Sequence, residues 1–564
     1  MASALKDRVL SPRHIHQLID DGFTIVLLGR KVLKIPATWL EQHPGGNNII
    51  LHMIGRDATD EVNAFHKEET KRQMLGYQIG TVLDKWVNVT PPIQRVSRSL
   101  PAKLVEDEIP SIQVHDEASS VLSRSSSASS VRDIGSSSSS CILDDAYPMR
   151  RRRAASPASF ATSISEDSDL DEDEKAPAEP EPEPDLRQDD GAPGDEEQLA
   201  DITDSFRGLV AKLESRGLYH CNYWAYAGDV SRVALNFSIM LCLLRAGWYL
   251  TSAIFMGCFW HQLVFTAHDA GHKGITHNYH IDTLIGMTIG NYMGGLSMGW
   301  WKRAHNIHHV VTNDPAHDPD IEHLPFMAIS PRLFQSLYST HFDRVLPFNR
   351  FAQMMVPHQK WMYYPLLCFG RFNLYALSLE HLILDLGPRS HRWHRYYELA
   401  GQVFFWYWFG YWIVYCQVPT WPLRLAYVLL AHMITMPLHV QFTLSHFAMG
   451  TETPGPNEPW AVQQLRTTMD VACPTWMDWF HGGLQFQAVH HLFPMLPRHN
   501  LRAASEEVKV WSESVGIKYE IYGFQKCNGR VMSRLEEVGK QARMWKDCHQ
   551  MILEKGDYMK GEWE

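Results

Sequence analysis

The chain has 564 residues, more than one ordinary domain needs, and 45% of them are hydrophobic. Its formal net charge of −11 argues against a nucleic-acid partner, because phosphate binding needs a basic face. The nine cysteines include no CxxC pair, so the sequence predicts neither a disulfide framework nor a thiolate zinc site.

Residues 8–82 alternate short apolar runs with turn signals, which predicts a small α+β domain. His43 opens a His-Pro-Gly-Gly segment, and His66 follows 23 residues later. A haem iron held by two imidazoles needs one histidine from each wall of a cleft, and glycines let the backbone approach the flat porphyrin. With both axial positions filled, such a site can only pass electrons.

The segments around His43 and His66 resemble the cytochrome b5 family over about 75 residues. The resemblance implies that these histidines are the axial ligands of haem b and that a separate NADH-cytochrome b5 reductase supplies electrons. It also implies an acidic rim that docks redox partners electrostatically, formed by Asp57, Asp60, Glu61, Glu68 and Glu69.

Residues 83–200 are rich in serine, proline and acidic side chains and are too polar to form a core. Low hydrophobicity combined with like charge predicts a disordered linker. An amphipathic stretch, Phe206–Leu218, follows it and leads into long apolar segments.

The apolar segments predict about four transmembrane helices. Val233–Phe265 is too long for one crossing, and we expect it to form a hairpin that turns near Arg245–Trp248. Leu399–Gln417 and Leu423–Phe442 predict a second hairpin. Ile281–Trp301 is glycine-rich, and we expect a segment that does not cross the membrane.

Three histidine clusters lie beside these segments. On a helix, positions i, i+3 and i+4 share one face, so each cluster directs its imidazoles toward one point. Seven clustered histidines exceed what one tetrahedral zinc needs, and two redox-active irons suit an attached haem. The clustered histidines are His268 and His272; His305, His308 and His309; His490 and His491. Four crossings would leave every cluster and the haem on the cytosolic face, as the basic residues before Leu399 also favour.

Around these clusters, residues 205–530 resemble the membrane fatty-acyl and sphingolipid desaturases. The resemblance implies a non-haem di-iron centre held by the seven histidines, with a further ligand at His446 or, as the alternative, His439. Gln487 begins the third cluster where many desaturases have histidine, which marks the front-end group with a fused cytochrome b5; its own role as a ligand stays open. Asp269, Asn306, Asp318 and Asp320 are candidates for orienting the imidazoles.

The expected fold is therefore a small α+β cytochrome b5-like domain, a disordered linker, an all-α integral membrane desaturase domain and a helical tail over residues 531–564. The implied reaction uses O2 to introduce a double bond at the Δ8 position of the sphingoid base of ceramide-type lipids. This substrate rests on likeness to sphingolipid Δ8-desaturases around His268–His272, His305–Asp320 and Tyr519–Arg530. The alternatives are a Δ5 or Δ6 fatty-acid desaturase, a lipid hydroxylase and a non-catalytic haem module on a membrane. The family resemblance alone implies the endoplasmic reticulum.

Overall fold

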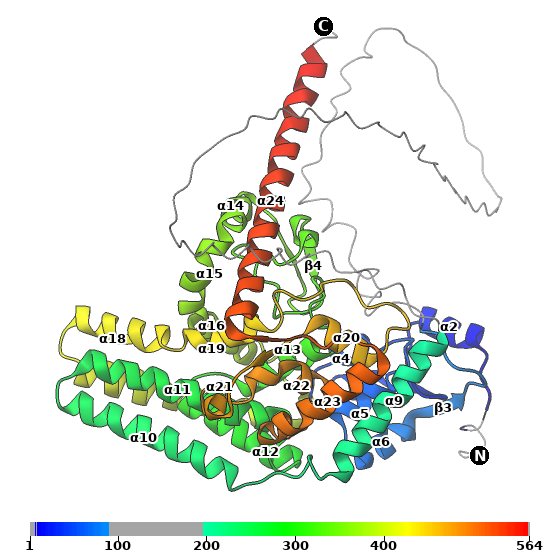
Figure 1. Ribbon diagram of the computed structural model, residues 1–564, viewed down its shortest axis with the longest axis horizontal. Helices are drawn as coiled ribbons and strands as arrows, with labels where there is room; N and C mark the ends of the chain where they lie inside the picture. Colours follow the sequence, from blue (N-terminus) through cyan, green and yellow to red (C-terminus); the bar gives the residue numbers. More distant parts are fainter. Residues whose placement is uncertain (1–5, 7, 89–195, 562–564) are drawn as a thin grey trace, which may run out of the picture. The chain divides into compact units, whose positions relative to one another are not determined.

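The computed structural model describes residue 6, residues 8–88 and residues 196–561. The described residues form an N-terminal domain of helices and strands and a larger domain that is almost entirely helical (Figure 1). Both belong to the same structural unit. The predicted linker falls mostly on residues 89–195, outside the described residues.

A three-stranded antiparallel sheet organises the N-terminal domain, and its strands alternate between two faces. Ile25 and Leu27 belong to one hydrophobic cluster, whereas Val26 and Leu33 belong to a second one that includes Phe65. The strands are β1 (Thr24–Leu28), β2 (Lys31–Ile35) and β3 (Gln78–Thr81). The second face is therefore the one that packs toward the histidine-bearing helices.

Short helices surround this sheet. They are α2 (Pro12–Asp20), α3 (Ala37–Leu40), α4 (Asn48–Leu51), α5 (Thr59–Phe65), α6 (Glu68–Met74) and the 3-10 turn η1 (Leu75–Tyr77). Ser11 caps α2 by accepting a hydrogen bond from the His14 N–H at 3.3 Å. Trp86 is buried and donates its indole N–H to the Gly55 carbonyl at 2.9 Å. Packed structure therefore continues past residue 82, where the sequence placed the end of this domain.

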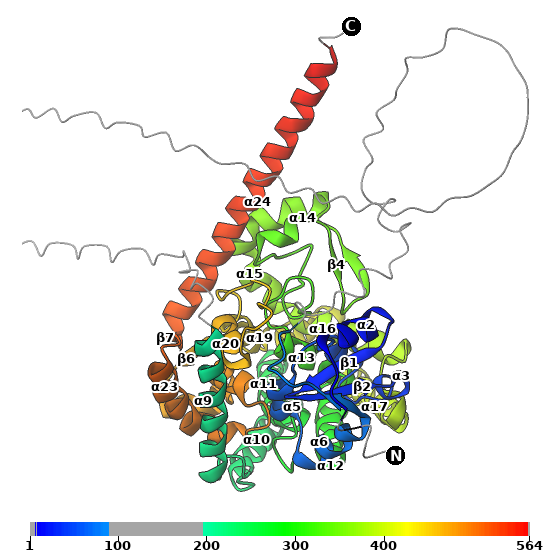
Figure 2. The same cartoon turned by 90° about the vertical axis from the view of Figure 1, so that its right-hand side faces the viewer.

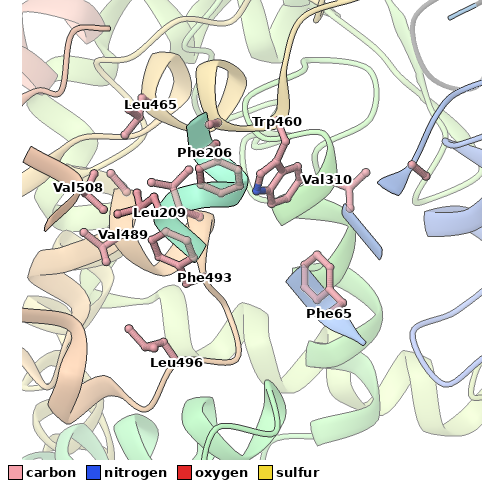
Figure 3. Close-up of a cluster of buried hydrophobic side chains, with 14 of the residues drawn as sticks. Phe65, Phe206, Leu209, Val310, Trp460, Leu465, Val489, Phe493, Leu496 and Val508 are labelled. Atoms are coloured by element: carbon pink, nitrogen blue, oxygen red, sulfur yellow. The ribbon is translucent and has the colours of Figure 1, made fainter. Parts of the chain in front are cut away.

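The first helix of the larger domain is α9 (Glu196–Ser215), which begins ten residues before the predicted amphipathic stretch. The last five residues assigned to the linker are thus helical, since acidic residues such as Glu196 and Glu197 suit a helix N-terminus. Figure 3 shows Phe206 of α9 beside Phe493, and the two rings stack with their centroids 5.6 Å apart. Arg207 pairs with Asp60 of the N-terminal domain at 2.8 Å. At least one residue of the predicted acidic rim, Asp60, therefore forms an ion pair within this chain.

Three helices among the described residues are long and apolar enough to cross a membrane: α10 (Ala225–Arg245), α11 (Tyr249–Gly271), and α18 (Trp421–Met433) continued by α19 (Met436–Leu444). Figure 1 shows α10, α11 and α18 side by side. The turn between the first two contains Gly247 at φ +79°, as the predicted hairpin requires. Only 17% of the apolar window of α10 is buried, which leaves a face suited to lipid.

The predicted span Leu399–Gln417 is helical, but it is not among the three helices that are long and apolar enough to cross a membrane. It lies on α17 (Trp393–Phe405) and the π-helix η6 (Trp406–Gln417). The latter is rich in Trp and Tyr, which favour the membrane interface more than the hydrocarbon centre. The count of four crossings therefore stays a prediction.

The glycine-rich segment Ile281–Trp301 folds back on itself. It contains α12 (Tyr279–Met287), the π-helix η2 (Thr288–Met293) and the start of α13 (Met298–Val310). Between the last two, Gly295 has φ +70°, and the Leu296 N–H donates to the Gly290 carbonyl at 2.8 Å. A β-carbon on Gly290 would lie 2.9 Å from the Leu296 carbonyl oxygen, so glycine permits the close turn. This shape agrees with a segment that does not cross.

The remaining elements close the larger domain around these helices. They are η3 (Pro331–Phe334), β4 (Leu337–Ser339), β5 (Arg344–Leu346), α14 (Arg350–Met355), η4 (Val356–His358), α15 (Gln359–Cys368), α16 (Gly370–Ile383), η5 (Arg389–His391), α20 (Trp460–Thr467), β6 (Asp470–Ala472), η7 (Thr475–Met477), α21 (Asp478–His481), η8 (Leu484–Phe486), α22 (Gln487–Leu492), η9 (Arg498–Asn500), α23 (Leu501–Val515), β7 (Ile521–Gly523) and α24 (Phe524–Gly561). Strands β4 and β5 pair antiparallel, whereas β6 and β7 pair parallel. Residues 531–561 of the predicted C-terminal tail are part of α24, which Figure 2 shows as one continuous helix.

Candidate metal centres and haem cleft

The rings of His43 and His66 face each other across a gap that suits a haem. Their centroids are 6.1 Å apart. Two imidazoles that bind one metal from opposite sides, each at about 2 Å, place their ring centres roughly 6 Å apart. Each Nδ1 lies within hydrogen-bonding distance of a backbone carbonyl, Gly46 at 2.8 Å and Val62 at 3.2 Å, which leaves Nε2 for the metal. The pair therefore fits a bis-histidine haem.

Glycine brings the His43 loop against α13 of the helical domain. A β-carbon on Gly45 would lie 3.2 Å from the amide nitrogen of Asn306. Gly46 has φ +85°, a conformation that favours glycine. The haem cleft and the helix that carries the second histidine cluster are therefore in direct contact.

The first group of clustered histidines combines all three segments. His268 and His272 come from the end of α11, His305 from α13 and His490 from α22. One nitrogen of each lies within 4.8 Å of the others. A β-carbon on Gly271, inside the first cluster, would lie 2.0 Å from the Trp301 ring, so glycine allows α11 and α13 to meet here.

A second group lies beside the first. It contains His308, His446 and His491, whose ligand atoms also lie within 4.8 Å of one another. His309 lies between the two groups: its Nε2 is 3.1 Å from that of His305, and its ring stacks on that of His491 with centroids 4.1 Å apart. Two adjacent sets of imidazoles fit two metal ions better than one.

Several nitrogens in these groups are buried with no hydrogen-bond partner, including Nε2 of His490 and of His491 and both ring nitrogens of His272. Buried polar atoms are rarely left unsatisfied, so these converging nitrogens fit the ligands of metal cations. Burial, followed by the charges of neighbouring imidazoles, lowers the pKa of His272, His309 and His491 well below the usual histidine value. These rings are therefore neutral near pH 7, the form that binds metal.

Two side chains orient the second group. The carboxylate of Asp318 lies 2.9 Å from His308 Nδ1 and also accepts the Asn313 N–H at 2.7 Å. Burial lowers the pKa of His308, but the carboxylates of Asp318 and Asp320 outweigh this effect and raise the pKa to about 9. The amide oxygen of Gln464 lies 3.0 Å from His491 Nδ1. Such partners fix the ring orientation and tautomer of a metal ligand.

We expect Asp318→Asn to lower iron affinity at the second group by roughly 10–100-fold, since partners of ligating histidines contribute about that much. Iron per chain, measured during titration with a chelator, reports the change. Asp314→Asn is the matched control: Asp314 is also buried, but its carboxylate accepts a hydrogen bond from the Thr453 hydroxyl at 2.9 Å and belongs to neither histidine group. Equal iron retention in Asp318→Asn and the unaltered chain would contradict this role.

Other predicted residues lie elsewhere. Asp269 accepts a hydrogen bond from the Tyr226 hydroxyl at 2.6 Å and pairs with Arg498 at 3.0 Å, so its carboxylate bonds to the scaffold. Asn306 faces the Gly45 loop. His439 is buried, but it belongs to neither group.

A cavity of about 590 Å³ borders both groups. His268, His305, His308, His446 and Gln487 line it, together with apolar side chains such as Leu263 and Ile289. A volume of this size is typical of a site for a small organic ligand. Gln487 therefore lines the cavity beside the imidazoles.

Phe65 joins the two candidate centres. Its ring meets that of His309 edge-on, with centroids 5.8 Å apart, and it is the residue before His66. Lys273, which follows His272, donates to the Phe65 carbonyl at 2.6 Å. Figure 3 shows Phe65 beside Val310 of α13. No sequence motif indicated these contacts, because they join segments more than 200 residues apart.

Two family models match different parts of the chain. Residues 21–83 match the cytochrome b5-like heme/steroid binding domain, and residues 246–520 match the fatty acid desaturases. The first match contains the facing pair His43 and His66, and the second contains all three histidine clusters.

Curated relatives match both parts at once. The chain is 46% identical to a delta 8-(E)-sphingolipid desaturase of Emericella nidulans, over 99% of both chains. It is 45% identical to a delta 8-(E)-sphingolipid desaturase of Kluyveromyces lactis, over 96% of this chain and 94% of the relative. A Delta(8)-fatty-acid desaturase 2 of Arabidopsis thaliana is 34% identical over 62% of this chain and 77% of its own.

Proposed function

The chain belongs to the delta 8-(E)-sphingolipid desaturases, and we propose that it introduces a double bond at the Δ8 position of the sphingoid base of ceramide-type lipids. The observation that carries this proposal is the pair of adjacent imidazole groups beside a largely apolar cavity.

We assign His268, His272, His305 and His490 to one iron and His308, His446 and His491 to the other, with His309 close to both. When bound, the irons supply the O2-dependent chemistry that removes hydrogen from an unactivated C–H bond, which no side chain can do. Asp318 and Gln464 hold their imidazole partners in place.

The cavity holds the alkyl chain and excludes water. Trp260 and Leu263 of α11 line it, and so do Asp320, His323 and Arg344. We assign the hydrocarbon to the apolar side chains and the polar head group to the charged ones. Such an arrangement would place a fixed carbon of the base next to the irons.

The N-terminal domain is the proposed electron donor. His43 and His66 would hold haem b, which would supply electrons one at a time, and a separate NADH-cytochrome b5 reductase would replenish them. Reduction of O2 to two waters takes four electrons and four protons. Two electrons and two protons would come from the broken C–H bonds, and the other two electrons and two protons from the donor domain and from solvent. The contact between Phe65 and His309 would give the electrons a short packed route.

We place the protein in the endoplasmic reticulum membrane with both centres on the cytosolic face. The three apolar helices support a membrane location, and the N-terminal domain packs on the helices that carry the histidine groups. Protease protection of a tag at either chain end, in sealed microsomes, tests this orientation.

Lipid mass spectrometry after expression in a host without such an enzyme tests the substrate. We expect new double bonds in the sphingoid base of ceramide-type lipids, and none in a host that expresses the His268→Ala variant. New double bonds confined to fatty acids would instead support a Δ5 or Δ6 fatty-acid desaturase. Added hydroxyls would support a lipid hydroxylase, and unchanged lipids a non-catalytic haem carrier.

A further inference from the structure

Lys302 of α13 lies beside the loop that carries His43. It lines a small cavity of about 50 Å³ together with Pro44 and Gly46 of that loop. Asn306, one turn further along the same face of α13, is the residue that a β-carbon on Gly45 would approach to 3.2 Å. Lys302 of the helical domain therefore lies close to the loop that follows His43.

The ammonium group of Lys302 has no carboxylate partner within the described ranges 8–88 and 196–561. Its residue is 7% exposed, and its Nζ lies 5.0 Å from the centre of the Tyr279 ring. Burial, followed by the charge of Lys273, lowers the pKa of Lys302 to about 7, whereas the charge of Asp282 raises it. The buried carboxylate of Asp282 already accepts bonds from Thr276, the N–H at 3.0 Å and the hydroxyl at 2.7 Å.

An anion that binds beside a buried ammonium group would stabilise its charged form. Haem b carries two propionate carboxylates at one edge. The charge of Lys302 acts on the His43 ring, so the lysine is within electrostatic reach of the haem iron ligand. A carboxylate in the Lys302 cavity would neutralise the cation and form a charge-assisted hydrogen bond.

We propose that Lys302 binds a propionate of the haem b held between His43 and His66, so that the helical domain completes the haem site. The proposal rests on the haem-binding role proposed above. Its consequence is that one helix serves both centres, because α13 carries Lys302 as well as His305 and His309. Haem binding then strengthens the docking of the two domains.

The rate of haem loss from the full-length protein to excess apomyoglobin tests the proposal. The protein is loaded either with haem b or with haem b dimethyl ester, whose propionates carry no charge. We expect Lys302→Met to lose haem b roughly tenfold faster than the unaltered chain, as loss of one charge-assisted hydrogen bond predicts. With the dimethyl ester, the two proteins should lose haem at equal rates, and Lys302→Arg should behave like the unaltered chain with both haems.

Lys71→Met is the matched control, because Lys71 also acts by its charge on a haem ligand, His66, but its Nζ already contacts Glu68 and Asn63. It should leave the rate of haem loss unchanged. Lys302→Met would overturn the proposal if it lost haem b at the unaltered rate or accelerated the loss of both haems equally. If this variant fails to fold, the test compares the two haems in the unaltered chain. Equal rates of loss of haem b and its dimethyl ester would overturn the proposal. A chain that takes up neither haem would contradict the haem-binding role itself.

Discussion

His491→Ala is expected to abolish desaturation and to release iron from the second histidine group while the haem spectrum stays intact. His491 is fully buried and is one of only three histidines in that group among the described residues. Its ring also stacks on His309, with centroids 4.1 Å apart. Loss of a ligand should cost more than the roughly 10–100-fold that the outer partners contribute. Iron analysis of purified protein and lipid mass spectrometry measure the two effects.

The matched control for His491→Ala is His439→Ala. Both histidines are buried, but His439 belongs to neither histidine group. The control should therefore keep the iron content of the unaltered chain, which we expect to be about two irons per chain because the clustered histidines form two groups. Full iron content in His491→Ala would exclude it as a ligand. Loss of iron in His439→Ala would favour His439 as the further ligand in place of His446.

The clusters themselves could be found from the sequence because helical geometry brings positions i, i+3 and i+4 together. His305, His308 and His309 follow this pattern on α13, and the structure brings them to both groups. Asn306 lies on the same helix and is close to the Gly45 loop. Its expected role in orienting an imidazole stays a prediction.

Contacts between distant segments could not be predicted. Gln464 holds His491 from another helix 27 residues earlier, and an isolated glutamine has no recognisable pattern. Lys302 and Phe65 belong to no sequence motif, and their contacts become visible only where the two domains meet. The number of membrane crossings also remains open, because the aromatic helix over Trp406–Gln417 suits an interface as well as a span.

His43→Ala should produce the opposite defect: the b-type haem spectrum disappears and NADH-supported turnover stops, while iron content stays unchanged. Its ring is one of the two that face each other at 6.1 Å, and it belongs to neither histidine group. The measurement uses purified protein with reductase and no other cytochrome b5. His16→Ala, an exposed histidine of the same domain, should keep both spectrum and turnover. Undiminished turnover in His43→Ala would contradict the fused domain as the electron donor.

A chemical reductant separates the two defects. Dithionite can reduce the irons without the haem, so it should restore a single turnover in His43→Ala. It should restore nothing in His491→Ala, because that variant lacks the metal that dithionite would reduce. This asymmetry follows from the order of the two centres along the electron path, with the haem cleft upstream and Phe65 between them. If dithionite rescued His491→Ala as well, the histidine groups would not be the place where O2 is used.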